Sequence, residues 1–178
     1  MRRLATALFV FAVGCDDLPS EDELRENFRV HRERIETLQI MADEDRARLC
    51  GLSEDTCAVT VQISNVDTTK EPPSYKVVDS ERDAERIPFD RLDQYAVFAD
   101  AVPSNDLHLR SDADRFSLLA ARSGLSVGGT LYRYVHDPGP DGPVYDKLSD
   151  LVADQAERSF RAGYIRLEDD WYIDYRAS

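Results

Sequence analysis

The sequence predicts a single α+β domain in which three helices pack on one side of an antiparallel sheet of about five strands. Apolar residues recur at helical spacing between residues 24 and 42, and they alternate with polar ones between residues 57 and 64. After residue 103, most of the chain follows strand patterns separated by turn residues. No internal repeat or linker divides residues 21–178, so we expect them to form one domain.

Residues 1–14 are expected to be a signal peptide and not part of this domain. Arg2 and Arg3 form a short positive region, and residues 4–13 (LATALFVFAV) form an uncharged, mostly apolar run. This run is too short to cross a bilayer, because a membrane-spanning helix needs about 20 apolar residues. We therefore expect the chain to be exported.

Cys15 follows this leader directly, in the sequence AVGC. The junction resembles the lipobox of bacterial lipoproteins, although Ala12 stands where leucine is usual. We expect a lipid anchor on Cys15, residues 15–20 as a short tether, and a location in the bacterial cell envelope facing the periplasm. Asp16 resembles an inner-membrane retention signal, but the choice of membrane stays open. The alternative is ordinary cleavage after Gly14, which would leave a soluble protein with a free thiol.

The composition is strongly acidic, with 35 Asp and Glu against 22 Lys and Arg and a formal charge of −13. Two arginines leave with the signal peptide, which takes the mature charge to −15. Nucleic acid is excluded as a partner, because such binding depends on Lys and Arg contacts to phosphates. Adsorption to an anionic bilayer is excluded as well, which leaves the lipid as the contact with the membrane.

The cysteines are three in number, and a lipid on Cys15 would leave Cys50 and Cys57 as an even pair in an oxidising compartment. We expect these two to form a disulfide. The alternative is two small buried thiols. Their spacing gives no metal signal, because no second Cys or His pair stands at ligand distance.

The first half of the domain is expected to begin with a long helix. Ser20 and Glu23 form a capping box, Gly51 is the stop signal, and a break is allowed near residues 42–43. A half-buried strand is expected at 57–64 and a polar excursion at 65–86, with a short strand possible at 75–78. Pro88 then opens a second helix. Its predicted apolar stripe consists of Phe89, Leu92, Tyr95 and either Phe98 or Ala99.

The second half is expected to contain a hairpin of strands 116–121 and 126–135, turning at residues 123–125, then a third helix over 145–160. A last hairpin joins 164–167 to 171–175. The third helix is predicted to turn Leu148, Leu151, Val152 and Phe160 inward. In the final strand, one face should carry Trp171, Ile173 and Tyr175 and the other Tyr172 and Asp174.

Three segments together resemble a group of small proteobacterial lipoproteins without an assigned activity. They are NFRVHRERIETLQIMADED at 27–45, SGLSVGGTLYRYVHDP at 123–138 and YIRLEDDWYIDYR at 164–176. The resemblance spans most of the mature chain and is built from apolar periodicity, a Gly-Leu-Ser turn and a terminal Trp-Tyr pair. It implies the lipid anchor on Cys15 and carries over no catalytic or binding residue.

Catalytic patterns are few. Residues 124–128 (GLSVG) match the nucleophile motif G-x-S-x-G, but a strand pattern follows where that motif needs a helix, and no acid stands between Ser126 and His136. His31, His108 and His136 show no metal-ligand spacing. We therefore predict neither a metal site nor a cofactor. An envelope hydrolase or metal-dependent enzyme, using Ser126 or dispersed His and Asp residues, is the alternative.

Aromatic residues are the remaining candidates for function. Tyr132 and Tyr134 share one face of a strand, and Tyr172 lies on the final strand. We expect these tyrosines either to form an interaction surface or to belong to the core. The prediction for function is a non-enzymatic module of the envelope that binds another envelope protein or component. An immunity or inhibitor protein with an acidic binding face is one form of it, although no motif indicates that form.

Overall fold

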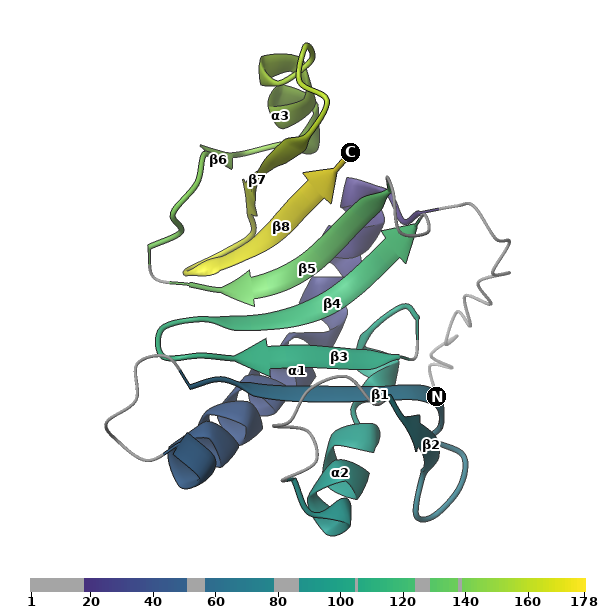
Figure 1. The fold of residues 1–178 in the computed structure, drawn as a ribbon. Coiled ribbons are helices and arrows are strands. Elements are labelled where there is room, and N and C mark those ends of the chain that lie inside the picture. Colours follow the sequence, from purple (N-terminus) through teal and green to yellow (C-terminus); the bar gives the residue numbers. More distant parts are fainter. Residues whose placement is uncertain (1–17, 51–56, 79–86, 105, 124–128, 138) are drawn as a thin grey trace, which may run out of the picture.

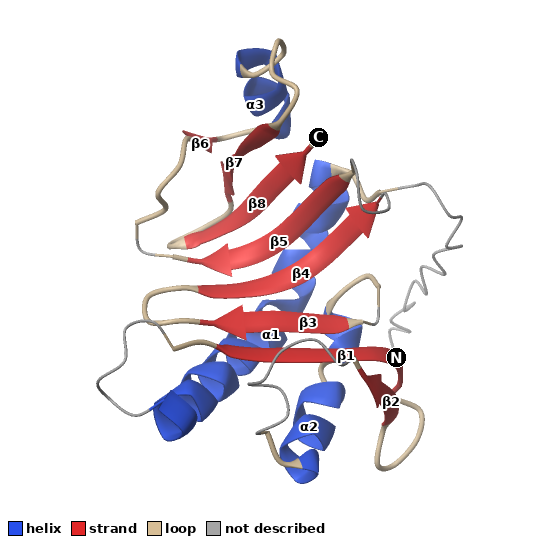
Figure 2. Cartoon of the chain, in the orientation of Figure 1, coloured by secondary structure: helices blue, strands red, loops and turns tan. Residues whose placement is uncertain are grey.

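The computed structural model describes residues 18–50, 57–78, 87–104, 106–123, 129–137 and 139–178. The predicted signal peptide, Cys15 and the turn around Ser126 lie outside these residues. Three α-helices and one eight-stranded mixed sheet make up the fold (Figures 1 and 2), which confirms the α+β class. The prediction of about five strands, all antiparallel, was wrong in detail. Within the described residues, no helix has the length and apolar character needed to span a membrane.

Helix α1 (Glu21–Cys50) runs along one face of the sheet and is unbroken at residues 42–43. The predicted capping box begins it: the Ser20 backbone N–H donates to Glu23 Oε2 over 2.8 Å, and the Glu23 N–H donates to Ser20 Oγ over 3.3 Å. Its buried stripe recurs at steps of three and four, because those positions share a helix face. The stripe includes Leu24, Phe28, Ile35, Leu38 and Ala42.

The sheet has the strand order β2-β1-β3-β4-β5-β8-β7-β6. All neighbouring strands pair antiparallel except β6 and β7, which pair parallel. The strands are β1 (Val59–Asp67), β2 (Ser74–Val77), β3 (Leu107–Ser111), β4 (Phe116–Ser123), β5 (Thr130–His136), β6 (Val144–Tyr145), β7 (Arg161–Arg166) and β8 (Trp171–Ala177). Strands β3 and β6 were not predicted, because five and two residues are too few for a clear alternation.

The two shorter helices differ from their predictions at the ends. Helix α2 (Phe89–Ala96) buries Leu92 and Tyr95, and the short 3-10 helix η2 (Ala99–Ala101) follows it, but Phe89 is 76% exposed. Helix α3 (Leu148–Asp154) begins later than predicted, because Tyr145 is extended and pairs with β7. Phe160, predicted to point inward, lies beyond α3 and is 51% exposed.

The core lies between the sheet and α1. Phe28 of α1 packs against Trp171 and Tyr134, with ring centroids 5.2 and 5.5 Å away. Helices α2 and α3 lie on this same side: Tyr95 of α2 donates to Asp45 of α1, and Leu151 of α3 packs against Gly163 of β7, whose register partner Tyr175 is part of the core. No described helix covers the opposite face, which is the one turned to the viewer in Figure 1.

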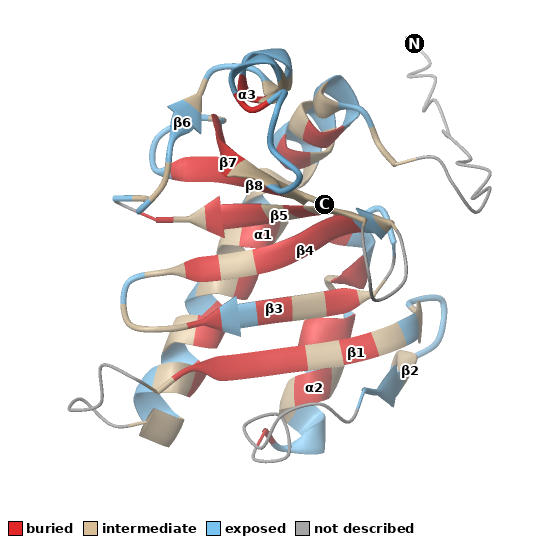
Figure 3. Cartoon of the chain, turned by 45° about the horizontal axis from the view of Figure 1, so that its top comes forward, coloured by how far each residue is buried: buried red, intermediate tan, exposed pale blue. Residues whose placement is uncertain are grey.

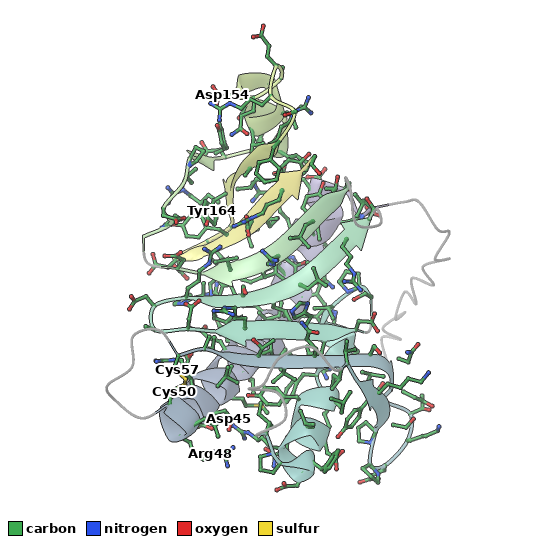
Figure 4. The ribbon with its side chains drawn as sticks, in the orientation of Figure 1. Asp45, Arg48, Cys50, Cys57, Asp154 and Tyr164 are labelled. Atoms are coloured by element: carbon green, nitrogen blue, oxygen red, sulfur yellow. A yellow bond between two sulfur atoms is a disulfide. The ribbon has the colours of Figure 1, made fainter. Side chains whose placement is uncertain are left out.

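The far end of α1 is fixed by charge and by a covalent bond. Asp45, only 2% exposed, accepts hydrogen bonds from Tyr95 Oη (2.7 Å), Arg91 Nε (2.9 Å) and Arg48 Nη2 (2.9 Å). Cys50 forms a disulfide with Cys57, as predicted, and their Cα atoms are 5.8 Å apart (Figure 4). The end of the helix is thereby joined to the residues just before β1.

Candidate functional site

The histidines considered as candidates for catalysis or metal binding do not lie together in one site. His31 lies on α1, His108 on β3 and His136 at the end of β5. His108 Nε2 is 2.6 Å from Gln62 Nε2, and His136 Nδ1 is 3.0 Å from Gln39 Nε2. Ser126 lies outside the described residues. Among the residues described, no group of three His, Cys, Asp or Glu side chains could hold a metal ion.

His136 does border a shallow hollow of about 290 Å³ between α1 and the beginning of β8. The centroid of its ring is 5.1 Å from that of Trp171. Arg32 also lines the hollow, and its guanidinium already forms ion pairs. That group is paired with Glu36 at 2.7 Å, Glu168 at 2.8 Å and Asp169 at 2.8 Å. The polar groups here satisfy one another, so this hollow offers little to a ligand.

The tyrosines predicted for an interaction surface are buried. Tyr132 and Tyr134 lie in the core, 6% and 0% exposed, and Tyr134 Oη donates to the Leu24 carbonyl over 2.9 Å. Tyr172 lies on the opposite face as predicted, yet it too is only 5% exposed. Of the two alternatives for these tyrosines, the structure therefore shows burial and not an exposed aromatic surface. The Arg166 guanidinium lies over the Tyr172 ring, and the Tyr164 ring meets it edge to face.

Arg166 belongs to a group of arginines on the face of the sheet opposite α1. Arg133 of β5 and Tyr164 of β7 are the register partners of Asp174 on the two sides of β8. Arg166 of β7 is the register partner of Tyr172 on β8. Because side chains alternate between the faces of a strand, all five residues project to the side away from the core.

Asp174 is the centre of this group. It is 1% exposed, and it accepts hydrogen bonds from Arg133 Nη1 at 3.3 Å and from Arg176 Nε at 3.1 Å. Arg115, which precedes β4, brings its Nη2 within 3.6 Å of the same carboxylate. One buried carboxylate therefore faces three guanidiniums, and it holds them together on the sheet.

Aromatic contacts connect the remaining members. The guanidinium of Arg115 lies over the Tyr164 ring at 5.4 Å, and that of Arg166 over the Tyr172 ring at 5.8 Å. The two rings meet edge to face, with centroids 6.1 Å apart. We call this connected set the arginine face. It comprises Arg115, Arg133, Arg166 and Arg176 with Asp174, Tyr164 and Tyr172.

The arginine face is positive within an acidic protein. Its four arginines and one aspartate give +3; Asp137, 3.9 Å from Arg115, and Asp141, hydrogen-bonded to Tyr164 Oη, lie at its margin and reduce this to +1. The whole chain carries −13. Burial lowers the pKa of Arg133, yet an arginine side chain stays protonated at neutral pH in any case.

The guanidiniums also reach solvent. The side chains of Arg115, Arg133 and Arg176 are 25%, 32% and 42% exposed, and Arg166 is exposed as well. The strands that carry them are buried or half-buried residue by residue, as Figure 3 shows for β5 and β8. Each arginine has five N–H donors, and the contacts within the face use only some of them. The remaining donors are available to a partner.

Sequence reasoning predicted the direction of Asp174 but missed this face. A signal existed: the arginines at 133, 166 and 176 are at positions that alternate with apolar residues of the core. The pairing of strands far apart in the chain, which brings them together, was not readable from that pattern.

Comparisons with models of protein families, with curated proteins and with solved structures found no match. The fold and site therefore define only a class, an α+β domain with an arginine-lined open sheet face. The resemblance to small proteobacterial lipoproteins stays a prediction.

Proposed function

We propose that this protein is a lipid-anchored module of the bacterial cell envelope, which binds another envelope component through the arginine face and carries out no reaction of its own. The observation that carries the proposal is a set of solvent-reaching guanidiniums on a sheet face that no described helix covers. Arginine and tyrosine are both enriched at protein interfaces. Residues of this kind, held in fixed positions, suit recognition.

The anchor is supported by the sequence around Cys15 and by the shortness of the tether. Leu18 already packs against the hydrophobic core, and only residues 16 and 17 separate it from Cys15. Three residues of extended chain reach at most about 11 Å. A lipid on Cys15 would therefore hold the beginning of α1 close to the bilayer. Arg25, near that end, donates to the carbonyls of Asp146 and Arg166, so the β6–β7 edge would lie there too.

Affinity capture tests the proposal. The lipidated full chain would be recovered from solubilised membranes as the unchanged protein, as Arg166→Glu and as Arg29→Glu. Arg29 lies on α1, where its side chain is 70% exposed, so its variant makes the same charge change away from the arginine face. We expect a discrete partner to be retained by the unchanged protein and by Arg29→Glu, and to be lost from Arg166→Glu.

Equal recovery of partners by all three proteins would overturn the proposed surface. The enzyme alternative has a separate outcome. Turnover in a hydrolase screen that disappears on Ser126→Ala, in a protein with no recoverable partner, would replace the binding function with catalysis.

A further inference from the structure

We propose that the partner of the arginine face is an acidic polypeptide segment, whose carboxylates pair with Arg166, Arg133 and Arg115. This inference rests on the proposed function and names the chemistry of the partner. The guanidinium is a planar fork of N–H donors that matches a carboxylate with two parallel hydrogen bonds. The arginine face already contains guanidinium–carboxylate hydrogen bonds, because Asp174 at its centre accepts from Arg133 Nη1 and from Arg176 Nε.

Asp174 shows which ligand the surrounding groups accept. Its carboxylate lies between Arg133 and Arg176 and is almost fully buried, so it fixes these two side chains before any partner arrives. Groups that are fixed in advance lose less conformational freedom on binding. Asp174, with Asp137 and Asp141 at the margin, leaves an excess of one positive charge among the four guanidiniums, which reach solvent. A second carboxylate, from outside, would complete the pairing.

Arg166 is the member with the most freedom for such a pairing. Its guanidinium is exposed, it lies over the Tyr172 ring, and no carboxylate among the described residues forms an ion pair with it. The contact with the ring involves the charge of the guanidinium and uses none of its N–H donors in a hydrogen bond. A carboxylate could therefore accept from these donors without displacing another carboxylate.

A polypeptide fits better than a phosphate-bearing membrane surface. Val135 and Tyr172 are 0% and 5% exposed, so the apolar area next to the charges is that of the arginine stems themselves, and interfaces between proteins combine apolar area with arginine. A bilayer held at the beginning of α1 would lie near the β6–β7 edge and Arg166, whereas Arg133, Arg115 and Arg176 lie further in, on β5, before β4 and on β8. The acidic remainder of the domain would also be repelled by anionic lipid.

The test uses the exported full chain without its lipid and a short fluorescent peptide rich in glutamate. The same peptide with glutamine in place of glutamate is the control for charge, and Arg29→Glu is the control protein for Arg166→Glu. We expect the glutamate peptide to bind the unchanged protein and Arg29→Glu with similar Kd, and Arg166→Glu about tenfold more weakly. Raising the salt concentration should weaken binding, and the glutamine peptide should not compete.

Three results would overturn this inference. The first is equal affinity of Arg166→Glu and Arg29→Glu for the glutamate peptide, or no binding of that peptide at all. The second is displacement of the peptide by inorganic phosphate when the phosphate concentration equals the concentration of peptide carboxylates. The third is stronger binding to vesicles of anionic phospholipid than to the peptide. None of these results would contradict the proposed function, because capturing a partner from membranes does not require that the partner is acidic.

Discussion

Arg133 and Asp174 stand opposite each other on β5 and β8, and the Arg133 guanidinium donates to the carboxylate over 3.3 Å on the face of the sheet away from the helices. They are 41 residues apart in the chain. Their pairing brings a buried negative charge to the centre of a positive surface, and it connects the stability of the sheet to its binding chemistry.

The Asp174→Asn variant should therefore be less stable. Removing the carboxylate leaves Arg133, Arg176 and Arg115 close together without their common counter-charge. Losing one partner of a buried charge cluster costs about 3 to 5 kcal/mol, and the partial exposure of the arginines reduces this, so we expect a loss of about 2 kcal/mol. Urea unfolding would measure it. Exposed Asp114→Asn is the control, and an equal loss in both variants would contradict the assigned role of Asp174.

The substitution Gly163→Ala should also destabilise the domain. A Cβ at this position would lie 2.8 Å from Leu151 Cδ1, 3.0 Å from Tyr145 Cε2 and 3.1 Å from the Pro143 carbonyl oxygen. Overpacking of this kind costs about 1 to 3 kcal/mol. Gly139→Ala is the matched control, because a Cβ there meets nothing within 4 Å. A thermal shift for Gly139→Ala as large as that for Gly163→Ala would show that α3 does not pack on β7 as described.

The disulfide between Cys50 and Cys57 should be present in the exported protein, which would be two hydrogens lighter than the dithiol in intact mass. Replacing both cysteines with serine should reduce the free energy of unfolding by about 2 to 3 kcal/mol, since the bond restricts the unfolded chain. The fold should persist, because Asp45 still holds the end of α1. Rapid alkylation of both thiols in the native, unreduced protein would refute the bond.

Stability should fall between pH 10 and pH 12. Burial raises the pKa of Tyr75 and of Tyr132 to about 12, and it raises the pKa of Tyr95 as well. In the unfolded chain these tyrosines ionise near pH 10, while the folded protein keeps their protons. The stabilisation is therefore complete below pH 10 and is lost as pH rises through the folded pKa values. Urea unfolding at several pH values would measure this loss, and Tyr132→Phe should make it smaller. An unchanged free energy over this range would contradict the burial of these hydroxyls.

Membrane attachment should depend on Cys15. Expressed in a bacterium, the full chain should incorporate a fatty-acid analogue and partition into detergent, whereas Cys15→Ser should do neither. Cys57→Ser is the control, since it removes a different thiol. Export of Cys15→Ser with unchanged membrane association would refute the anchor.

How far the sequence predicts this fold depends on the range of the interactions involved. The capping box at Ser20 and the stripe through Leu24, Phe28 and Ile35 are local, and they predicted α1 nearly to the residue. Tyr145 has the same apolar character as a helix residue, but pairing with Ile165 makes it extended. Its conformation is decided by a neighbouring strand, which no local pattern contains.

The candidate site was less predictable than the fold for the same reason. Alternation along β8 predicted that Tyr172 and Asp174 face away from Trp171, which the structure confirms. Two of the three arginines that meet Asp174 come from elsewhere in the chain, Arg133 from β5 and Arg115 from just before β4. Their approach depends on strand order, which the sequence did not specify. For Tyr172 the sequence left open whether the ring belongs to an interaction surface or is buried; the structure buries it, with the Arg166 guanidinium over the ring.

Photo-crosslinking in membranes tests the central claim most directly. A photoreactive residue would replace Arg122, which is exposed on the open sheet face, or Val30, which is 59% exposed on α1. The lipidated protein would be irradiated in intact cells. The arginine face as a binding surface predicts a discrete crosslinked product from position 122, absent when Arg166→Glu is added, and none from position 30. A product from position 30 alone, or products from position 122 that persist with Arg166→Glu, would contradict it.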